Sequence, residues 1–202
     1  MKILIIGGTG LIGGAVAKEL KKDTQLLLAS FGNSQADYQV DISSADSIEK
    51  LFKQTGKLDG IVCAAAQGLV LKPLVEMVEA DYVASMQQKL LGQINIVLKG
   101  IPILNDHGSI TLTTGIMNRD IVKNSTAVAM ANSALEGFAY AAAFDAPRGI
   151  RINVVSPGLV KETAEKYAAV CPGFEPVESE KVARAFRRSI YGIETGMVYC
   201  VR

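Results

Sequence analysis

Short apolar runs and longer stretches of helical spacing alternate along the chain. The apolar runs are rich in β-branched residues and predict buried strands at residues 2–6, 25–29, 38–42, 61–66, 109–114, 150–158 and 197–201. Apolar residues at helical spacing predict helices at about 11–20, 43–54, 73–100, 124–146 and 179–190, and Ser43 or Ser44 would cap the second of them. This alternation, without a repeat or a linker, predicts one α/β domain over residues 1–202: a doubly wound, mostly parallel sheet with helices on both faces.

A glycine-rich turn joins the first predicted strand to the first predicted helix. Gly8, Gly10 and Gly13 satisfy the spacing G-x-G-x-x-G, and Gly7, Gly10 and Gly13 satisfy G-x-x-G-x-x-G. In either reading, glycine permits the tight turn, lets the backbone approach a pyrophosphate, and leaves the first N–H groups of the helix facing the anion. Because the motif follows a strand and opens a helix, we expect a dinucleotide-binding turn of the Rossmann type. A turn that carries glycine for steric reasons alone is the alternative.

Composition and charge narrow the class of partner. Of the 202 residues, 49% are hydrophobic, only 6% are aromatic and none is Trp, which is typical of an aliphatic core built from helices and parallel strands. The 21 basic and 20 acidic residues are well mixed and leave a net charge of +1. Since the sequence has neither a basic stripe nor a polybasic patch, we expect no nucleic acid and no membrane surface as partner. A small molecule or another protein is expected instead.

Cysteine and histidine usage argues against disulfide and metal sites. Cys63, Cys171 and Cys200 are odd in number and widely spaced, so reduced thiols are expected. His107 is the single histidine and the cysteines do not cluster, so no metal site is expected. We interpret His107 as a surface residue rather than a base. The sequence lacks a secretory signal and any apolar run of about 18 residues, the length a membrane-spanning helix needs, which favours a cytoplasmic chain.

Five segments carry a resemblance to a known family. They are GGTGLIG at 7–13, Asp41-Ile42, DGIVCAAA at 59–66, GSITLTTG at 108–115, and ALEGF followed by PRGIRINVVSPG at 147–158. In these segments the chain resembles the short-chain dehydrogenase/reductase family, and the match spans nearly the whole sequence. The resemblance implies a single-domain Rossmann fold that binds NAD or NADP. The glycine turn departs slightly, because its middle glycine is Gly10 rather than residue 11, as in atypical and extended members.

The resemblance also implies cofactor contacts residue by residue. The glycine turn would hold the pyrophosphate, residues 41 and 42 would meet the adenine edge, residues 64–66 would lie near the ribose, and residues 157–160 would line the nicotinamide side. With the ends of the second and fifth strands included, the predicted cofactor-binding residues are Gly7, Thr9, Gly10, Leu11, Ile12, Gly13, Ser30, Asp41, Ile42, Ala64, Ala65, Ala66, Thr113, Pro157, Gly158, Leu159 and Val160. Plain structural alternatives exist: Asp41 would cap a helix, the alanines would pack a strand, and residues 157–158 would turn the chain.

The end of the second strand bears on the choice between NAD and NADP. An acid there would bind the ribose 2′-hydroxyl, whereas a basic side chain would accept a 2′-phosphate. This chain has Ser30, Phe31, Gly32 and Asn33 at that place. The missing acid favours NADP, and the missing arginine leaves NAD open.

The catalytic residues of the family are replaced in this chain. The family uses a Tyr as general acid and base, a Lys four residues later, a Ser that orients the substrate oxygen, and an Asn that supports a water relay. Alignment on ALEGF places Val128 at the Tyr position and Asn132 at the Lys position, while Gly115 stands for the Ser and Lys89 for the Asn. A phenol with an ordinary pKa of about 10 needs a cationic neighbour to work at neutral pH. The active site is therefore predicted to be degenerate.

Several residues are candidates for substitute chemistry. Thr113 and Thr114 would hydrogen-bond a carbonyl group at the end of their strand, Asn132 would reach a ribose hydroxyl, and Lys89 would supply charge if its helix faces the cleft. The loop in which the family places substrate contacts holds Asn118, Arg119 and Lys123. Each candidate also has a plain reading, since threonines suit strands, an Asn within a helix satisfies its own hydrogen bonds, and loop cations are usually solvated.

Two functions from different classes fit these features. The first is a short-chain oxidoreductase that uses NAD(P) on a small carbonyl or alcohol substrate with an atypical active site, since the cofactor carries the hydride chemistry. The alternative is a catalytically inactive dinucleotide-binding sensor, or a structural or regulatory partner protein. The intact phosphate turn beside the replaced catalytic residues favours binding, whereas fold analogy favours the oxidoreductase.

Two long predicted helices indicate self-association. The helices at about 74–99 and 124–146 keep apolar residues over many turns and resemble those that pair in dimers and tetramers of the family. The small residues Ala131, Ala134 and Gly137 would permit close approach. A homodimer or homotetramer is therefore expected, although packing against the sheet explains part of the same pattern.

Overall fold

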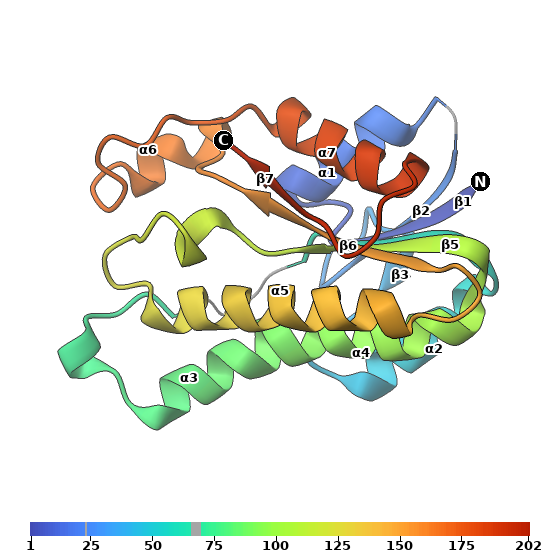
Figure 1. Cartoon of the computed structure of the whole chain (residues 1–202), viewed down its shortest axis with the longest axis horizontal. Coiled ribbons are helices and arrows are strands. Elements are labelled where there is room, and N and C mark those ends of the chain that lie inside the picture. Colours follow the sequence, from blue (N-terminus) through green and yellow to red (C-terminus); the bar gives the residue numbers. More distant parts are fainter. Residues whose placement is uncertain (23, 66–69) are drawn as a thin grey trace.

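The sheet at the centre of the molecule is parallel throughout (Figure 1). The computed structural model describes residues 1–22, 24–65 and 70–202. Its strands are β1 (Lys2–Ile6), β2 (Gln25–Ser30), β3 (Tyr38–Gln39), β4 (Leu58–Cys63), β5 (Leu104–Thr113), β6 (Arg151–Pro157) and β7 (Val198–Val201). They lie in the order β3-β2-β1-β4-β5-β6-β7, and every neighbouring pair is parallel. The predicted α/β class with a doubly wound sheet is confirmed.

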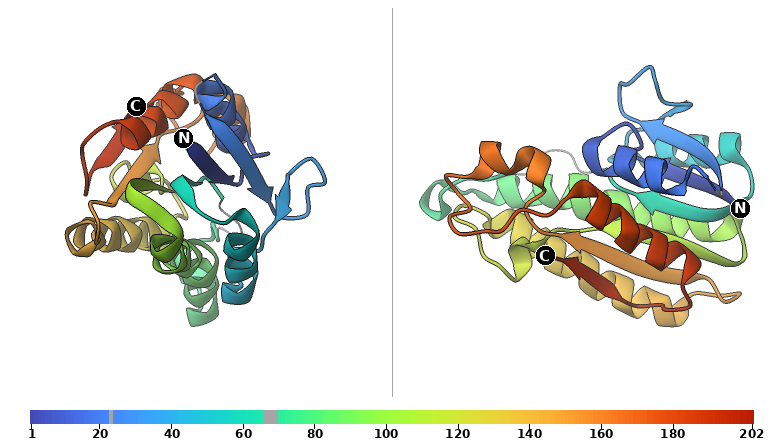
Figure 2. Two further views of the ribbon diagram at one scale, coloured as in Figure 1. Left: turned by 90° about the vertical axis from the view of Figure 1, so that its right-hand side faces the viewer. Right: turned by 90° about the horizontal axis from the view of Figure 1, so that it is seen from above.

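Helices cover both faces of the sheet (Figures 1 and 2). One face carries α1 (Leu11–Leu20) and α7 (Ser179–Tyr191), which pack side by side, and the other carries α2 (Ala45–Thr55), α4 (Gly92–Gly100) and α5 (Thr126–Asp145). Two short helices, α3 (Glu79–Ser85) and α6 (Ala164–Tyr167), lie beyond the carboxyl ends of the strands. Within the described ranges, none of these helices combines the length and apolar character of a membrane span.

Each face of the sheet has its own apolar core. Ile3 and Ile5 of β1 belong to the cluster under α1 and α7, whereas Leu4 and Ile6 belong to the cluster under α2, α4 and α5. All four side chains are fully buried. Because both faces are covered, the strands read as continuous apolar runs rather than as an alternation of apolar and polar residues.

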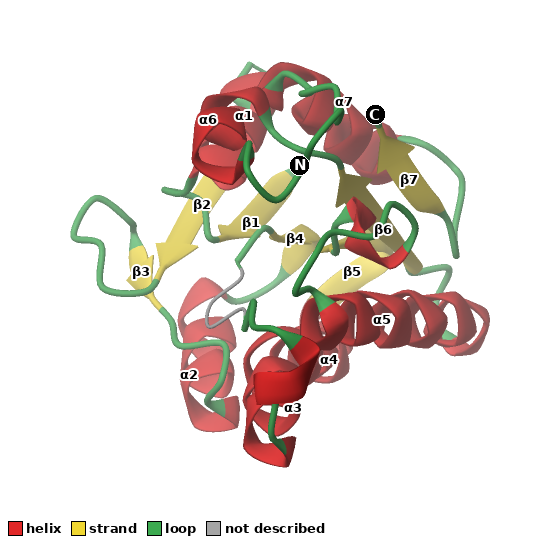
Figure 3. Ribbon diagram, turned by 90° about the vertical axis from the view of Figure 1, so that its left-hand side faces the viewer, coloured by secondary structure: helices red, strands yellow, loops and turns green. Residues whose placement is uncertain are grey.

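The chain reverses its progress across the sheet between β3 and β4. From β1 the strands first proceed outward through β2 to β3, and β4 then returns to the other side of β1, from where β5, β6 and β7 continue outward (Figure 3). At such a reversal, the crossover helices lie on opposite faces and leave a crevice at the carboxyl ends of the strands. The glycine turn follows β1 at this place, so the fold puts it where open α/β sheets bind ligands.

The helix predicted at about 73–100 begins later than expected, because only residues 79–100 form one continuous helical run. The structure has a 3₁₀ turn (Leu74–Glu76), α3, a π-helical segment (Met86–Leu91) and then α4. At the end of the π-helical segment, a Cβ on Gly92 would lie 2.7 Å from the carbonyl oxygen of Ile42, so the helix here contacts the chain after β3 at backbone distance. A π turn inserts one residue into a helix, so the helical period changes locally in the segment that ends beside this contact. Apolar spacing alone does not distinguish the two kinds of turn.

Two predicted strands are shorter or shifted. The strand expected at 38–42 ends at Gln39, because the Asp41 carboxylate accepts hydrogen bonds from the backbone N and the hydroxyl of Ser43, at 2.9 and 2.6 Å, and bends the chain into α2. Ser44 is the cap of that helix, as one of the two predicted candidates, and accepts a bond from Ser47 N. The strand expected at 61–66 runs from Leu58 to Cys63, and its expected end lies outside the described residues.

Candidate functional site

The glycine turn brings α1 into backbone contact with the end of β1. Gly7 adopts a left-handed φ of 82° and donates its N–H to Ala29 O at 2.7 Å. A Cβ on Gly13 would lie 2.1 Å from Gly7 O, so only glycine fits where the helix crosses the turn. Gly10 is the N-cap of α1, and no side chain among the described residues caps this helix. Its amino end therefore presents uncapped backbone N–H groups to an anion.

A cavity of about 200 Å³ adjoins the glycine turn. It is lined by Ile6, Gly7, Thr9, Gly10, Ser30, Phe31, Val40, Ile42, Ala64 and Ala65. Inside it, the hydroxyls of Thr9 and Ser30 lie 2.7 Å apart, and the backbone N of Thr9 also donates to Ser30 Oγ at 3.3 Å. The structure thus brings together the ends of β1, β2 and β4, as an extended nucleotide would require. Among the lining residues, the sequence analysis missed Ile6, Phe31 and Val40 as contacts; their signal was their position at strand ends.

Four other residues that were predicted to contact the cofactor are not among the described residues that line this cavity. Leu11 is largely exposed and Ile12 packs against the core under α1, so neither side chain lines this cavity. Asp41 has its carboxylate in the local turn with Ser43, a structural role, although Ser44 rather than Asp41 caps α2. Ala66 lies outside the described residues.

A second cavity, of about 500 Å³, lies on the predicted nicotinamide side. It is lined by Ile116, Asp120, Ile121, Gly158, Leu159, Pro172, Gly173, Phe174, Glu175 and Arg202. Gly158 and Leu159 were predicted here, whereas Pro157 is the last residue of β6 and Val160 is buried in a bridge with Val177. The chain after β5, the segment after β6 and the end of β7 meet at this cavity. The sequence signal that could have found its far wall is the Pro-Gly turn followed by Phe174.

Thr113 turns away from both cavities. Its hydroxyl donates to Cys63 O at 2.5 Å, and the side-chain amide of Gln93 bonds to its backbone N and O, each at 2.9 Å. Its polar groups are thus satisfied inside the protein. The plain reading, a threonine that suits a strand, describes this residue.

Three of the residues predicted to stand at the family's catalytic positions, Lys89, Gly115 and Asn132, lie together just after β5. Lys89, from the π-helical segment, donates its Nζ to Thr114 O at 3.5 Å, and Asn132, from α5, donates its Nδ2 to Gly115 O at 3.0 Å. Burial lowers the pKa of Lys89 to about 8. Val128 is buried and offers no polar group. An amine and an amide thus lie next to each other's carbonyl partners just after β5, and Val128 provides no phenol at the position predicted for the family's Tyr.

A buried carboxylate that the sequence analysis missed holds the loop after β5. Glu136 of α5 accepts hydrogen bonds from Thr114 Oγ1 at 3.0 Å and from Asn118 Nδ2 at 2.9 Å. Arg119 pairs with it through two bonds of 2.9 and 2.6 Å. Thr114, Asn118 and Arg119, which were candidates for substrate contact, thus anchor their own loop to α5. Arg119 is therefore an ion-pair partner rather than a cation exposed only to solvent. Lys123 is exposed.

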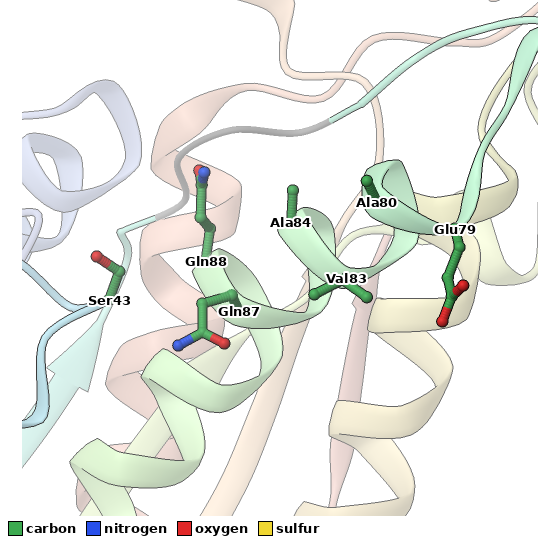
Figure 4. A pocket seen from close by; sticks show the side chains of 7 residues that line it. All are labelled: Ser43, Glu79, Ala80, Val83, Ala84, Gln87 and Gln88. Carbon is green, nitrogen blue, oxygen red and sulfur yellow. The ribbon is translucent and has the colours of Figure 1, made fainter.

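Another cavity, of about 570 Å³, lies along α3 and the π-helical segment (Figure 4). It is lined by Ser43, Glu79, Ala80, Val83, Ala84, Gln87 and Gln88. None of the residues predicted to hold the cofactor lines it. We therefore assign it no part in the dinucleotide site.

Comparisons with known proteins agree with this geometry. A family model described as enoyl-(acyl carrier protein) reductase matches residues 7–195. The short-chain dehydrogenase/reductase ATR9 of Stachybotrys chlorohalonatus is 30% identical over 185 residues, which cover 77% of this chain and 72% of that protein. The chain belongs to the short-chain dehydrogenase/reductase family. The predicted family membership is confirmed.

Solved structures of similar proteins cover the whole chain. The crystal structure of protein lin1944 from Listeria innocua matches with a TM-score of 0.97 and 45% identity, over all of both chains. A small-chain dehydrogenase crystallised in complex with NADPH matches with a TM-score of 0.86 and 26% identity, over 100% of this chain and 96% of that one. The chain is thus a short-chain dehydrogenase/reductase in fold as well as in sequence.

Proposed function

We propose that the chain binds a nicotinamide dinucleotide across the carboxyl edge of the sheet, with the pyrophosphate at the glycine turn. One observation supports this proposal above the others. At Gly7 and Gly13 the backbone of the turn and of α1 approach so closely that no Cβ fits between them, and the amino end of α1 beside them has no capping side chain among the described residues. Backbone N–H groups at a helix start favour an anion. The adjoining cavity and the similar dehydrogenase that binds NADPH support the same proposal.

The residues that would hold the rest of the dinucleotide follow from the two cavities. Val40 and Ile42 offer apolar surface for an adenine ring, and the hydroxyls of Thr9 and Ser30 offer donors and acceptors for a ribose. Leu159 and Gly158 line the second cavity, on the nicotinamide side. Roles for the predicted contacts outside the cavities rest on the family resemblance alone.

We favour NADP over NAD as the cofactor. Among the described residues that line the cavity beside the glycine turn, none carries a carboxylate, which would bind a ribose 2′-hydroxyl and repel a 2′-phosphate. The complex of the similar dehydrogenase with NADPH points the same way. The neighbouring cavity that shares Phe31 and Val40 is lined by Asp37, Asp41 and Lys50, two acids and one cation, so we expect only a modest preference.

The reaction we propose is hydride transfer with a small carbonyl or alcohol substrate in an atypical active site. The bound nicotinamide would supply or accept the hydride. In this chain, Ile116, Leu159 and Phe174 offer apolar surface for the body of the substrate. We place the substrate oxygen toward the end of β5, which Ile116 follows closely in the chain. The alternative, an inactive dinucleotide-binding sensor or partner protein, is favoured by one observation: Val128 places no proton donor where the family has its Tyr.

Titration of the purified protein with NADPH and NADH, followed by nicotinamide fluorescence, tests the proposal. We expect micromolar binding of NADPH and weaker binding of NADH. Gly10→Glu places a carboxylate at the amino end of α1, where it repels a pyrophosphate, so binding should weaken at least tenfold relative to Gly10→Gln, or about 1.4 kcal/mol. The matched Gln variant controls for side-chain size at the same backbone position.

Either result of this titration is informative. Binding that only the Glu variant loses would support the site and justify a screen of carbonyl and alcohol substrates. Failure of the wild-type protein to bind either nucleotide would contradict the proposal, leave the glycine turn as a structural device, and direct attention to a protein partner.

We further propose that the chain forms a homodimer or homotetramer through the surfaces at about 74–99 and 124–146. Exposed apolar side chains support this proposal: Val83 and Leu98 on one segment, and Tyr140 and Phe144 on α5, where Phe144 is 73% exposed. Sedimentation at micromolar concentration should give two or four times the mass of one chain, and a monomer would refute the proposal. We also propose a cytoplasmic location, which the three free cysteines support.

A further inference from the structure

Lys89 is a buried amine whose hydrogen-bonding capacity is mostly unused. It is 4% exposed and lies in the π-helical segment between α3 and α4. Among the described residues, its Nζ has one hydrogen bond, to Thr114 O, at the long distance of 3.5 Å. An ammonium group has three donors, and donors left unpaired inside a protein cost free energy. A ligand or water oxygen is therefore the partner that this group lacks.

Asn132 offers the complementary group from the opposite helix. It is fully buried, and its Nδ2 binds Gly115 O, the carbonyl next along the chain from the one that Lys89 contacts. Its Oδ1 has no donor among the described residues. Ser85 Oγ, four residues before Lys89, is likewise buried without a partner there. Lys89 and Asn132 thus bring spare donors and a spare acceptor to the consecutive carbonyls of Thr114 and Gly115, just after β5, which suits a small molecule that both donates and accepts, such as water.

The charges around Lys89 leave it able to exchange its proton near neutral pH. From β4, the buried Cys63 thiol faces it, and burial raises the pKa of that thiol to about 12, so Cys63 is neutral. From α5, the Glu136 carboxylate binds Thr114 Oγ1 but is paired with Arg119. With no free counter-ion facing it in the described structure, Lys89 has its pKa lowered to about 8 by burial.

We propose that Lys89 is the proton donor of this active site, acting through a water molecule that Asn132 Oδ1 helps to hold. Relative to the family, the amine and the amide have exchanged helices: Lys89 stands at the family's Asn position and Asn132 at its Lys position. The chain thus keeps one amine and one amide at these two positions, but the amine now comes from the π-helical segment instead of α5. An acid with a pKa near the working pH is well matched to proton transfer.

The proposed proton transfer completes the carbonyl reduction and rests on the reductase function proposed above. The substrate's carbonyl carbon takes the hydride that the dinucleotide supplies, and the electrons of the C=O π bond move to oxygen. That oxygen takes a proton from the water, and the water takes one from the Lys89 ammonium. The products are the alcohol, the oxidised dinucleotide and a neutral Lys89 amine, which regains its proton from solvent.

Two measurements test the proposal on the full chain. First, ¹³C-labelled lysine followed by NMR should show one side chain that titrates near pH 8, disappears in Lys89→Met, and shifts when NADPH is added. Second, reduction of 2,3-butanedione by NADPH should fall tenfold per pH unit above about 8 in the wild-type protein. Lys89→Met should lower kcat by roughly 10²- to 10⁴-fold and abolish this fall. Lys99→Met, which removes an amine paired with Glu49 away from the site, is the matched control.

The outcomes separate this inference from the proposed function. If the wild-type protein fails to bind NADPH or to reduce the dione, the reductase function itself is overturned, and the inference falls with it. If the protein binds NADPH and reduces the dione but Lys89→Met keeps the wild-type rate and pH profile, the proton donor is another group. A Lys89 resonance that titrates at an ordinary pKa of about 10.4 and ignores NADPH would overturn the inference even if the variant were poorly folded.

Discussion

Replacing Gly13 by alanine is expected to destroy dinucleotide binding and to destabilise the protein, whereas the same change at the neighbouring Gly14 is expected to do neither. A Cβ on Gly13 would lie 2.1 Å from Gly7 O and 2.7 Å from Gly7 C, and these backbone atoms cannot move aside, since Gly7 N is bonded to Ala29 O. Forced overpacking of this kind costs up to about 3 kcal/mol. The amino end of α1 must then move away from the turn that would hold the pyrophosphate.

Gly14→Ala is the matched control within the same helix. The nearest atom to its added Cβ is Gly8 O at 3.9 Å, an ordinary contact, and alanine in a helix interior is more stable than glycine by roughly 0.5–1 kcal/mol. In urea denaturation, the free energy of unfolding should therefore be lower than that of the wild type for Gly13→Ala and higher for Gly14→Ala. NADPH fluorescence should show binding to Gly14→Ala and none to Gly13→Ala. A Gly13→Ala protein with wild-type stability and affinity would show that the close contact is not required.

Lys89→Met is expected to stabilise the protein by about 3 kcal/mol at pH 7, even though it should remove activity. Burial holds the pKa of Lys89 at about 8 in the folded protein, against about 10.4 in an unfolded chain. Between these values the unfolded chain binds more protons than the folded one, so the wild-type stability should rise with pH from about 8 to 10.4. Below pH 8 the full cost of the buried ammonium is present. Methionine fills a similar volume without that cost.

The measurement is the free energy of unfolding in urea at pH 7 and at pH 10 for the wild type, Lys89→Met and Lys99→Met. The difference between wild type and Lys89→Met should be largest at pH 7 and should shrink toward pH 10. Lys99→Met removes a partly exposed amine and should change stability by less than about 1 kcal/mol. If Lys89→Met is less stable than the wild type at pH 7, the buried amine is not the costly group inferred from its surroundings.

The strands and the glycine turn could be predicted from the sequence because their signals are local. Burial of both sheet faces makes each strand a continuous apolar run, and the crossing of α1 over the turn requires a glycine at a fixed spacing. The π-helical segment inside the helix predicted at 73–100 could not be predicted in this way. It lies beside the contact between Gly92 and Ile42, which are far apart in the sequence, and a single π turn barely changes the apolar period.

The roles of the predicted site residues stay predictions, but the structure shows which of them lie together. Alignment on the family predicts catalytic positions for Lys89, Asn132 and Gly115, and all three lie just after β5. Glu136 was missed because its partners, Thr114 and Arg119, come from another segment, and only the packing of that segment on α5 makes the carboxylate a shared acceptor. Arg202 and Phe174 were missed for the same reason, since a cavity formed by three loops leaves no periodic signal in any of them.

The Glu136 carboxylate has a consequence for how a substrate would be received. By binding Thr114, Asn118 and Arg119 together, it fixes the start of the loop that forms one side of the second cavity before any ligand arrives. A rigid wall removes the ordering entropy that a flexible loop would lose on binding, which favours tight association with a molecule of matching shape. The same rigidity prevents the wall from adapting, so selectivity in this protein would come from shape rather than from induced closure.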